Sequence, residues 1–167
     1  MVILFSGRKE KTEKEIIDIL TDFGANYISD KKISAASGGF TIISEYKKTD
    51  VKIDSGIAVM LDNSERFENQ IFPEGIIGIC ESSNLKALKI FRANNTPVIS
   101  CGMNPKSSVT LSSLNSSSIL LTVQRRINLP DKIIEPGEYQ IEISKKYSPF
   151  SIMASAVILF LKSDKSY

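Results

Sequence analysis

The stretch that decides the fold is residues 75–101, GIIGICESSNLKALKIFRANNTPVISC. Its first six and last four residues are largely apolar runs, typical of buried strands. Between them, Leu85, Leu88 and Phe91 recur at helical spacing, and the polar residues just before them offer several N-caps. A strand, a helix and a strand in so short a stretch form a βαβ unit, which requires parallel strands and a right-handed crossover. We expect the helix to pack on the sheet through these three apolar residues.

Upstream of this unit, the sequence predicts a second strand and helix and a further buried strand. Val2–Phe5 is a compact β-type run, and residues 9–23 carry apolar side chains at helical spacing. Gly24 is well placed to end that helix in a left-handed cap. Residues 56–61 form another buried-strand pattern. Residues 1–106 are therefore predicted to form a mainly parallel sheet flanked by helices.

Downstream, the pattern changes to alternation and then to a terminal helix. Residues 107–144 alternate apolar and polar side chains in several short runs, which favours an antiparallel β extension. Ser148 and Pro149 suit the N-cap and first position of a helix. The apolar run that follows, 150–161, is shorter than the roughly 18 residues of a membrane span and is predicted to be a buried helix. The fold class expected over 1–167 is therefore a single α/β domain.

Composition excludes several classes of function. The chain has no histidine and two cysteines, which excludes Ser-His-Asp and Cys-His catalysis and a structural zinc site, since such a site needs about four N or S ligands. The 21 basic and 19 acidic residues give a net charge of +2, and the basic pairs are scattered, so we expect no nucleic-acid partner. The apolar run at the N-terminus is shorter than the roughly 7–15 residues of a signal peptide. We therefore expect a cytoplasmic protein with reduced thiols and no membrane partner.

Residues 6–12, SGRKEKT, follow the first strand and open the first helix, which is the context of a phosphate-binding loop. Lys11 and Thr12 occupy the Lys and Thr positions of that motif, and Gly7 is the one glycine of the loop. Glu10 stands where the motif needs glycine. A carboxylate about 4 Å from a phosphate charge costs about 4 kcal/mol at an effective dielectric of 20. The alternative interpretation is an exposed, charged first turn of a helix.

With these elements in order, the chain resembles the central, ATP-binding domain of the Mur ligases and of their folylpolyglutamate synthase relatives. The resemblance rests on the SGRKEKT loop, on residues 98–102, which are similar to a strand of the VITFG type in that family, and on the alanine-containing closing helix. It covers most of the chain and implies the fold and a vestigial nucleotide pocket, in which ATP and Mg²⁺ would bind weakly. It does not imply ligase chemistry, because the family's catalytic histidine has no equivalent, the loop glycine is lost, and the family's flanking domains do not fit in 167 residues.

Polar residues that follow the predicted strands form a second candidate site. Asp62, Glu81, Asn84 and Asn104 each come after a strand end, and ligands of open α/β sheets bind at the carboxyl edge of the strands. Asp62 or Glu81 would hold Mg²⁺ there. The alternative is ordinary loop and helix-cap chemistry. No metal site is predicted from His and Cys clusters.

Cys80 and Cys101 end two strands that should be parallel neighbours. A thiol pair at this edge would be redox-active or bind a soft metal, whereas the alternative is two small buried apolar side chains.

Three functions remain open. The first is a Mur ligase-like accessory or regulatory domain that binds a nucleotide or phosphate ligand. The second is a small Mg²⁺-dependent enzyme that handles phosphates, and the third is a protein-interaction module with a vestigial pocket.

Overall fold

The computed structural model describes residues 2–5, 10–29, 32–36, 38–45, 54–61, 67–114, 118–129, 133–142 and 147–162. The helices of this part of the chain are α1 (Glu10–Asp22), α2 (Leu85–Ala93) and α3 (Pro149–Lys162). The strands are β1 (Val2–Phe5), β2 (Asn26–Ile28), β3 (Ile33–Ser34), β4 (Thr41–Glu45), β5 (Ser55–Met60), β6 (Gly75–Glu81), β7 (Val98–Cys101), β8 (Val109–Leu114), β9 (Ile119–Val123), β10 (Ile127–Asn128), β11 (Ile133–Ile134) and β12 (Gly137–Ile141).

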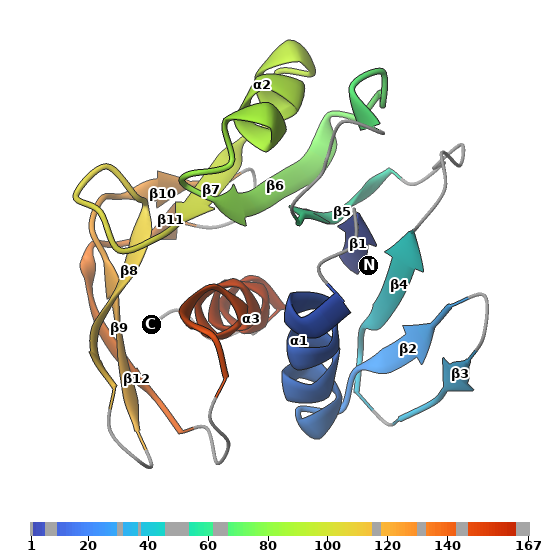
Figure 1. Cartoon of the computed structure of the whole chain (residues 1–167), viewed down its shortest axis with the longest axis horizontal. Helices are drawn as coiled ribbons and strands as arrows, with labels where there is room; N and C mark the ends of the chain where they lie inside the picture. The colour runs from blue at the N-terminus through green and yellow to red at the C-terminus, as the bar shows by residue number, and fades with distance from the viewer. Residues whose placement is uncertain are drawn as a thin grey trace.

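The strands form one large sheet, in the order β12-β9-β8-β7-β6-β5-β1-β4-β2-β3, and a separate β10-β11 pair (Figure 1). The strands from β2 through β4, β1, β5, β6 and β7 to β8 pair in parallel. The pairs β8-β9 and β9-β12 are antiparallel, as is the β2-β3 pair. This confirms the predicted α/β class, with a mainly parallel sheet and an antiparallel extension.

The predicted βαβ unit is present, but one contact of its helix was wrong. Strands β6 and β7 are parallel neighbours, and α2 lies between them in the chain. The buried side chains of α2 are Ala87, Ile90 and Phe91, whereas Leu88 is half-buried and Leu85 is 74% exposed. Residues at positions i, i+3 and i+4 share one helix face, and Leu85 lies about half a turn away from the face that those three define.

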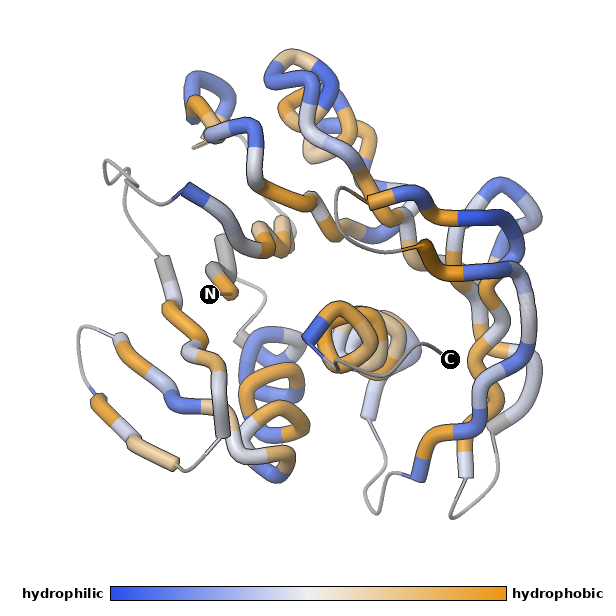
Figure 2. The backbone as a smooth tube through the Cα atoms, turned by 180° about the vertical axis from the view of Figure 1, so that it is seen from behind, coloured by the Kyte–Doolittle hydropathy of each residue, from blue (hydrophilic) through white to orange (hydrophobic). Residues whose placement is uncertain are grey.

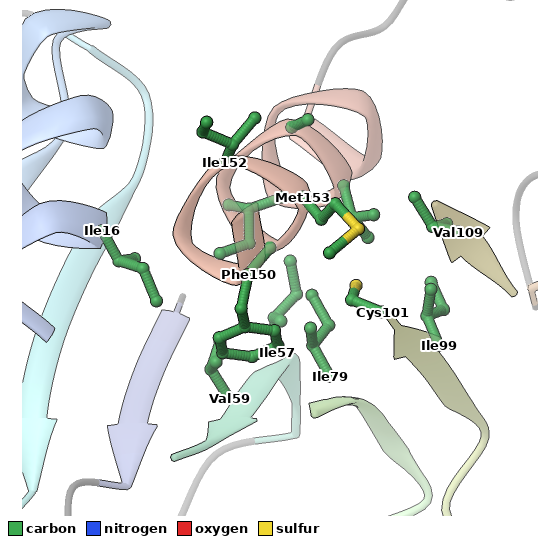
Figure 3. Close-up of a cluster of buried hydrophobic side chains, with 14 of the residues drawn as sticks. Ile16, Ile57, Val59, Ile79, Ile99, Cys101, Val109, Phe150, Ile152 and Met153 are labelled. Carbon is green, nitrogen blue, oxygen red and sulfur yellow. The ribbon is translucent and has the colours of Figure 1, made fainter. Parts of the chain in front are cut away.

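Helices α1 and α3 pack side by side on the opposite face of the sheet from α2. The larger of two apolar clusters holds residues of both helices, and the smaller holds those of α2. Figure 3 shows Phe150 and Met153 of α3 above Ile57, Ile79 and Cys101 of the strands. The sheet curves around α3, which is apolar along most of its length (Figures 1 and 2).

Helix α3 is buried on every side from its second residue to its tenth. All residues from Phe150 to Ile158 are buried, and the helix begins at Pro149, as the sequence predicts. No helix in the described part of the chain is long and apolar enough to cross a membrane. The end of α1 also agrees with the prediction, because Gly24 adopts a φ of +85° after the last turn.

Candidate functional site

At β1, the chain switches from adding strands on one side of the sheet to adding them on the other. Strand β1 lies between β4 and β5. After β1 the chain builds β2, β3 and β4 on one side, and then crosses to β5 and continues on the other side. In open α/β sheets, ligands bind beyond the carboxyl ends of the strands at such a switch point. Helix α1, which follows β1 in the chain, begins on this edge of the sheet.

The residues predicted to bind phosphate fall only partly within the described structure. Gly7 lies outside the described residues, and Glu10 is the first residue of α1. The Lys11 ammonium lies 3.8 Å from Glu15 Oε1 and its side chain is 86% exposed. Thr12 is buried, and its carbonyl oxygen accepts a hydrogen bond from Ser151 Oγ at 3.4 Å. That Gly7, Lys11 and Thr12 contact a ligand stays a prediction.

Glu15 joins α1 to the start of α3 through one carboxylate oxygen. Its Oε2 accepts hydrogen bonds from the Ser148 backbone N–H at 3.0 Å, from Ser148 Oγ at 2.5 Å and from Ser151 Oγ at 2.7 Å. Burial by itself raises the pKa of Glu15, but these hydrogen bonds and the Lys11 ammonium outweigh it, so the pKa lies below its ordinary value of 4.5. The negative charge also faces the positive end of the α3 dipole.

A groove beside α1 contains this contact and carries both signs of charge. Three lysines line it, Lys11, Lys14 and Lys32, together with Glu15 and Asp18. Both acids are engaged, Glu15 as described and Asp18 by the Tyr147 hydroxyl, which donates to Asp18 Oδ2 at 2.7 Å. The predicted Lys position of the phosphate motif therefore lies in a mixed-charge groove.

Glu13 is a candidate residue that the sequence analysis missed. It is 2% exposed, and its Oε1 has no hydrogen-bond partner in the described part of the chain. A buried polar atom without a partner costs free energy, and an isolated buried charge costs more. The signal lay in the spacing, because Glu13 precedes Ile16 by three residues and Leu20 by seven and therefore shares their apolar face.

The second candidate site includes side chains whose polar atoms already form hydrogen bonds within the protein. Asn84 is the N-cap of α2, where its Oδ1 accepts the Ala87 N–H at 3.0 Å. Its Nδ2 donates to the Leu61 carbonyl at 3.2 Å, which ties α2 to the end of β5. Asp62 lies outside the described residues. Glu81 is half-buried at the end of β6.

Asn104 similarly organises its own turn. Its Nδ2 donates to Ser82 Oγ at 2.7 Å, and its Oδ1 accepts the Lys106 N–H at 2.9 Å. A Cβ on Gly102 would lie 2.1 Å from Ser82 Oγ, so this glycine permits a close approach. No three His, Cys, Asp or Glu side chains of the described residues gather in a way that would hold a metal ion. The ligand role of these residues is still a prediction.

The hypothesis of a reactive thiol pair is wrong in its geometry. Cys80 pairs in register with Ser100, and Cys101 with Glu81, so the two cysteines alternate to opposite faces of the sheet. Cys80 belongs to the α2 cluster and Cys101 to the α3 cluster. Burial raises the pKa of Cys80 to about 12 and raises the pKa of Cys101 further. Both are free and behave as small apolar side chains.

Comparisons with known proteins give a likeness in fold. No family model matches the chain, and no curated protein sequence matches it either. Among solved structures, a murein peptide ligase from Psychrobacter arcticus 273-4 superposes with a TM-score of 0.53 at 9% identity. The match covers 96% of this chain but 43% of the ligase, so the chain spans less than half of that protein's length. At this identity the comparison supports a Mur ligase-like fold and carries no activity with it.

Proposed function

We propose that the chain binds a nucleotide or another phosphate-containing ligand beyond the carboxyl ends of β1 and β5. It acts as an accessory or regulatory protein of the cytoplasm, without ligase chemistry. The observation that supports the proposal is the position of α1, which follows β1 at the switch point of the sheet, where ligands of open α/β sheets bind. The unpaired N–H groups and the positive dipole of a helix N-terminus attract phosphate. Lys11 adds an exposed cation in the first turn.

Glu13 fits the magnesium ion that accompanies a nucleotide. Mg²⁺ takes oxygen ligands, usually one or two carboxylates together with phosphate oxygens. The unpartnered Oε1 of Glu13 would be such a ligand, and a cation there would compensate its burial. A bound Mg²⁺ would neutralise part of the negative charge of the phosphates. It would thereby offset the repulsion that the Glu13 and Glu10 carboxylates exert on the ligand.

Calorimetric titration with ATP and Mg²⁺ tests the proposal. We expect weak binding by the native chain and clearly tighter binding by Glu10→Gly, which removes a carboxylate and frees the backbone of the first turn. Adding Lys11→Ala to Glu10→Gly should abolish the gain. Lys14→Ala in the same background is the matched control, because it removes another exposed lysine of α1, and it should preserve the gain.

Two outcomes decide against this function. If Glu10→Gly binds ATP no better than the native chain, the loop is only the start of a helix. If Lys14→Ala abolishes the gain as fully as Lys11→Ala, the effect is one of general charge. Replacing Glu13 by Gln should lower the Mg²⁺ dependence of binding, and an unchanged dependence removes Glu13 from the site.

Ligase activity is expected to be absent. The chain has no histidine, and Glu10 replaces the glycine of the loop. ADP release that depends on an added amino acid would contradict this expectation.

A protein-interaction role is the second candidate. The observation that favours it is an apolar cleft beside the edge strand β12, far along the sheet from β1.

A further inference from the structure

A cleft lined largely by apolar side chains lies beside β12, outside the site proposed above. It has a volume of about 690 Å³ and runs between β12, the second half of α3 and the segment around the end of α1. Its large apolar side chains are those of Phe23, Phe40, Tyr139, Ile141, Leu159 and Phe160. The rings of Tyr139 and Phe160 pack with centroids 5.1 Å apart and form one wall. Phe23 is 49% exposed on the opposite side.

The cleft follows the backbone edge of β12. All five residues from Glu138 to Glu142 line it, although successive side chains of a strand point to opposite faces. A groove that contacts both faces of consecutive residues must run along the edge of the strand. Strand β12 is the last strand of the sheet, and no described strand pairs with its outer edge. Its unpaired N–H and C=O groups are a template for another strand.

The two faces of β12 differ in chemistry. Tyr139 and Ile141 are half-buried toward α3, while Glu138, Gln140 and Glu142 are exposed. A strand added to this edge would alternate in the same way. Its apolar side chains would cover Leu159 and Phe160, which β12 leaves half-buried, and its other side chains would stand beside the two carboxylates. The charged residues that line the cleft are two acids, Glu138 and Glu142, and one lysine, Lys162.

We infer that this cleft binds an extended peptide segment of a partner protein by strand addition to β12. The segment alternates apolar residues, directed at α3, with basic residues, directed at Glu138 and Glu142. Backbone hydrogen bonds supply affinity, and the alternating side chains supply specificity. A second copy of this chain fits less well, because antiparallel β12 strands centred on Gln140 would place Glu138 of each copy opposite Glu142 of the other.

A titration of the ¹⁵N-labelled chain with an acetylated hexapeptide of alternating valine and lysine tests the inference. We expect saturable shifts of the amide signals of residues 138–142. Alternate residues of an extended strand direct their N–H groups to the same side, so of two further peptides, one N-methylated at the lysine amides and one at the valine amides, one should bind about tenfold more weakly because it loses its backbone hydrogen bonds to β12. A peptide with three valines followed by three lysines should bind more weakly too, because it keeps the composition but loses the alternation.

The contribution of the two carboxylates to binding is tested by substitutions in the protein. Reversal of both acids in Glu138→Lys/Glu142→Lys should weaken the alternating valine and lysine peptide about tenfold and favour a valine and glutamate peptide instead. The matched control is Glu68→Lys/Glu74→Lys, which reverses two exposed acids outside the cleft and should leave binding unchanged.

Several results would overturn the inference. One is the absence of shifts at residues 138–142 up to millimolar peptide. Another is that neither N-methylated peptide binds more weakly than the unmodified one, which would mean capture of apolar side chains alone. A concentration-dependent dimer that protects β12 from the peptide would assign the edge to a second copy.

Discussion

Replacing Glu15 by glutamine should destabilise the fold by about 2 kcal/mol. An amide oxygen can still occupy the position of Oε2 and accept from Ser148 and Ser151, so the substitution removes charge and little else. Hydrogen bonds to a charged group contribute about 1.5–3 kcal/mol each, against about 0.5–1.5 for neutral ones. The interaction with the α3 dipole adds about 0.3–1 kcal/mol. The Glu15 side chain is 12% exposed, so solvent screens part of these interactions, and the expected loss of stability, about 2 kcal/mol, lies at the lower end of what they add up to.

The assay is urea unfolding of both proteins across pH. A loss of stability lowers the midpoint without changing the slope. Because the pKa of Glu15 is lowered in the folded chain, its contribution is fully present above the ordinary value of 4.5 and is lost as pH falls through the folded pKa. The native chain should therefore exceed Glu15→Gln by a constant amount near neutral pH, and the difference should shrink below about pH 4.5.

The control for this experiment is Glu138→Gln, which neutralises an exposed carboxylate of β12 and should leave stability within about 0.5 kcal/mol of the native value. The reasoning is refuted if Glu15→Gln is as stable as the native chain at neutral pH. It is also refuted if the difference persists unchanged at pH 3, because the charge would then not be its source.

The remaining predictions concern α2 and the two cysteines. A Cβ at residue 78 would lie 2.8 Å from the Phe91 ring, so Gly78→Ala should destabilise by about 1–3 kcal/mol in the same assay; an unaltered midpoint would mean that the ring moves freely. Phe91→Ala should cost about 3–5 kcal/mol, whereas Leu85→Ala should change stability by less than about 0.5, and similar losses for both would contradict the observed helix face. Cys80 and Cys101 should resist a thiol reagent at pH 8 until denaturant is added, and rapid labelling of the native chain would refute their burial.

Local patterns in the sequence were sufficient for much of the fold. The apolar runs of β6 and β7 and the helical spacing between them define a βαβ unit, because each signal is contained within a few residues. The caps at Ser148 and Pro149 similarly define the start of α3. The two-residue strands β10 and β11 are too short to produce a periodic pattern, and the sequence analysis did not find them.

The errors concern contacts that depend on register or on distant segments. Cys80 and Cys101 both end strands, but which face each occupies depends on the register between β6 and β7, and a shift of one residue exchanges the faces. The contact of Glu15 with Ser148 joins residues 133 positions apart, and no local pattern encodes it. The first candidate site could be located at the edge of the sheet, but its ligand contacts depend on loop positions that periodicity does not determine.

The packing of α3 on the sheet also determines when the protein can fold. Synthesis proceeds from the N-terminus, so every strand of the sheet leaves the ribosome before α3 does. Until residue 158 has been made, the face of the sheet that α3 covers has no partner for Ile57, Ile79 and Leu121, which are buried in the finished fold. Contacts of such long sequence separation slow folding. This face of the sheet can therefore be closed only after α3 has been synthesised, so the last helix of the chain completes the core.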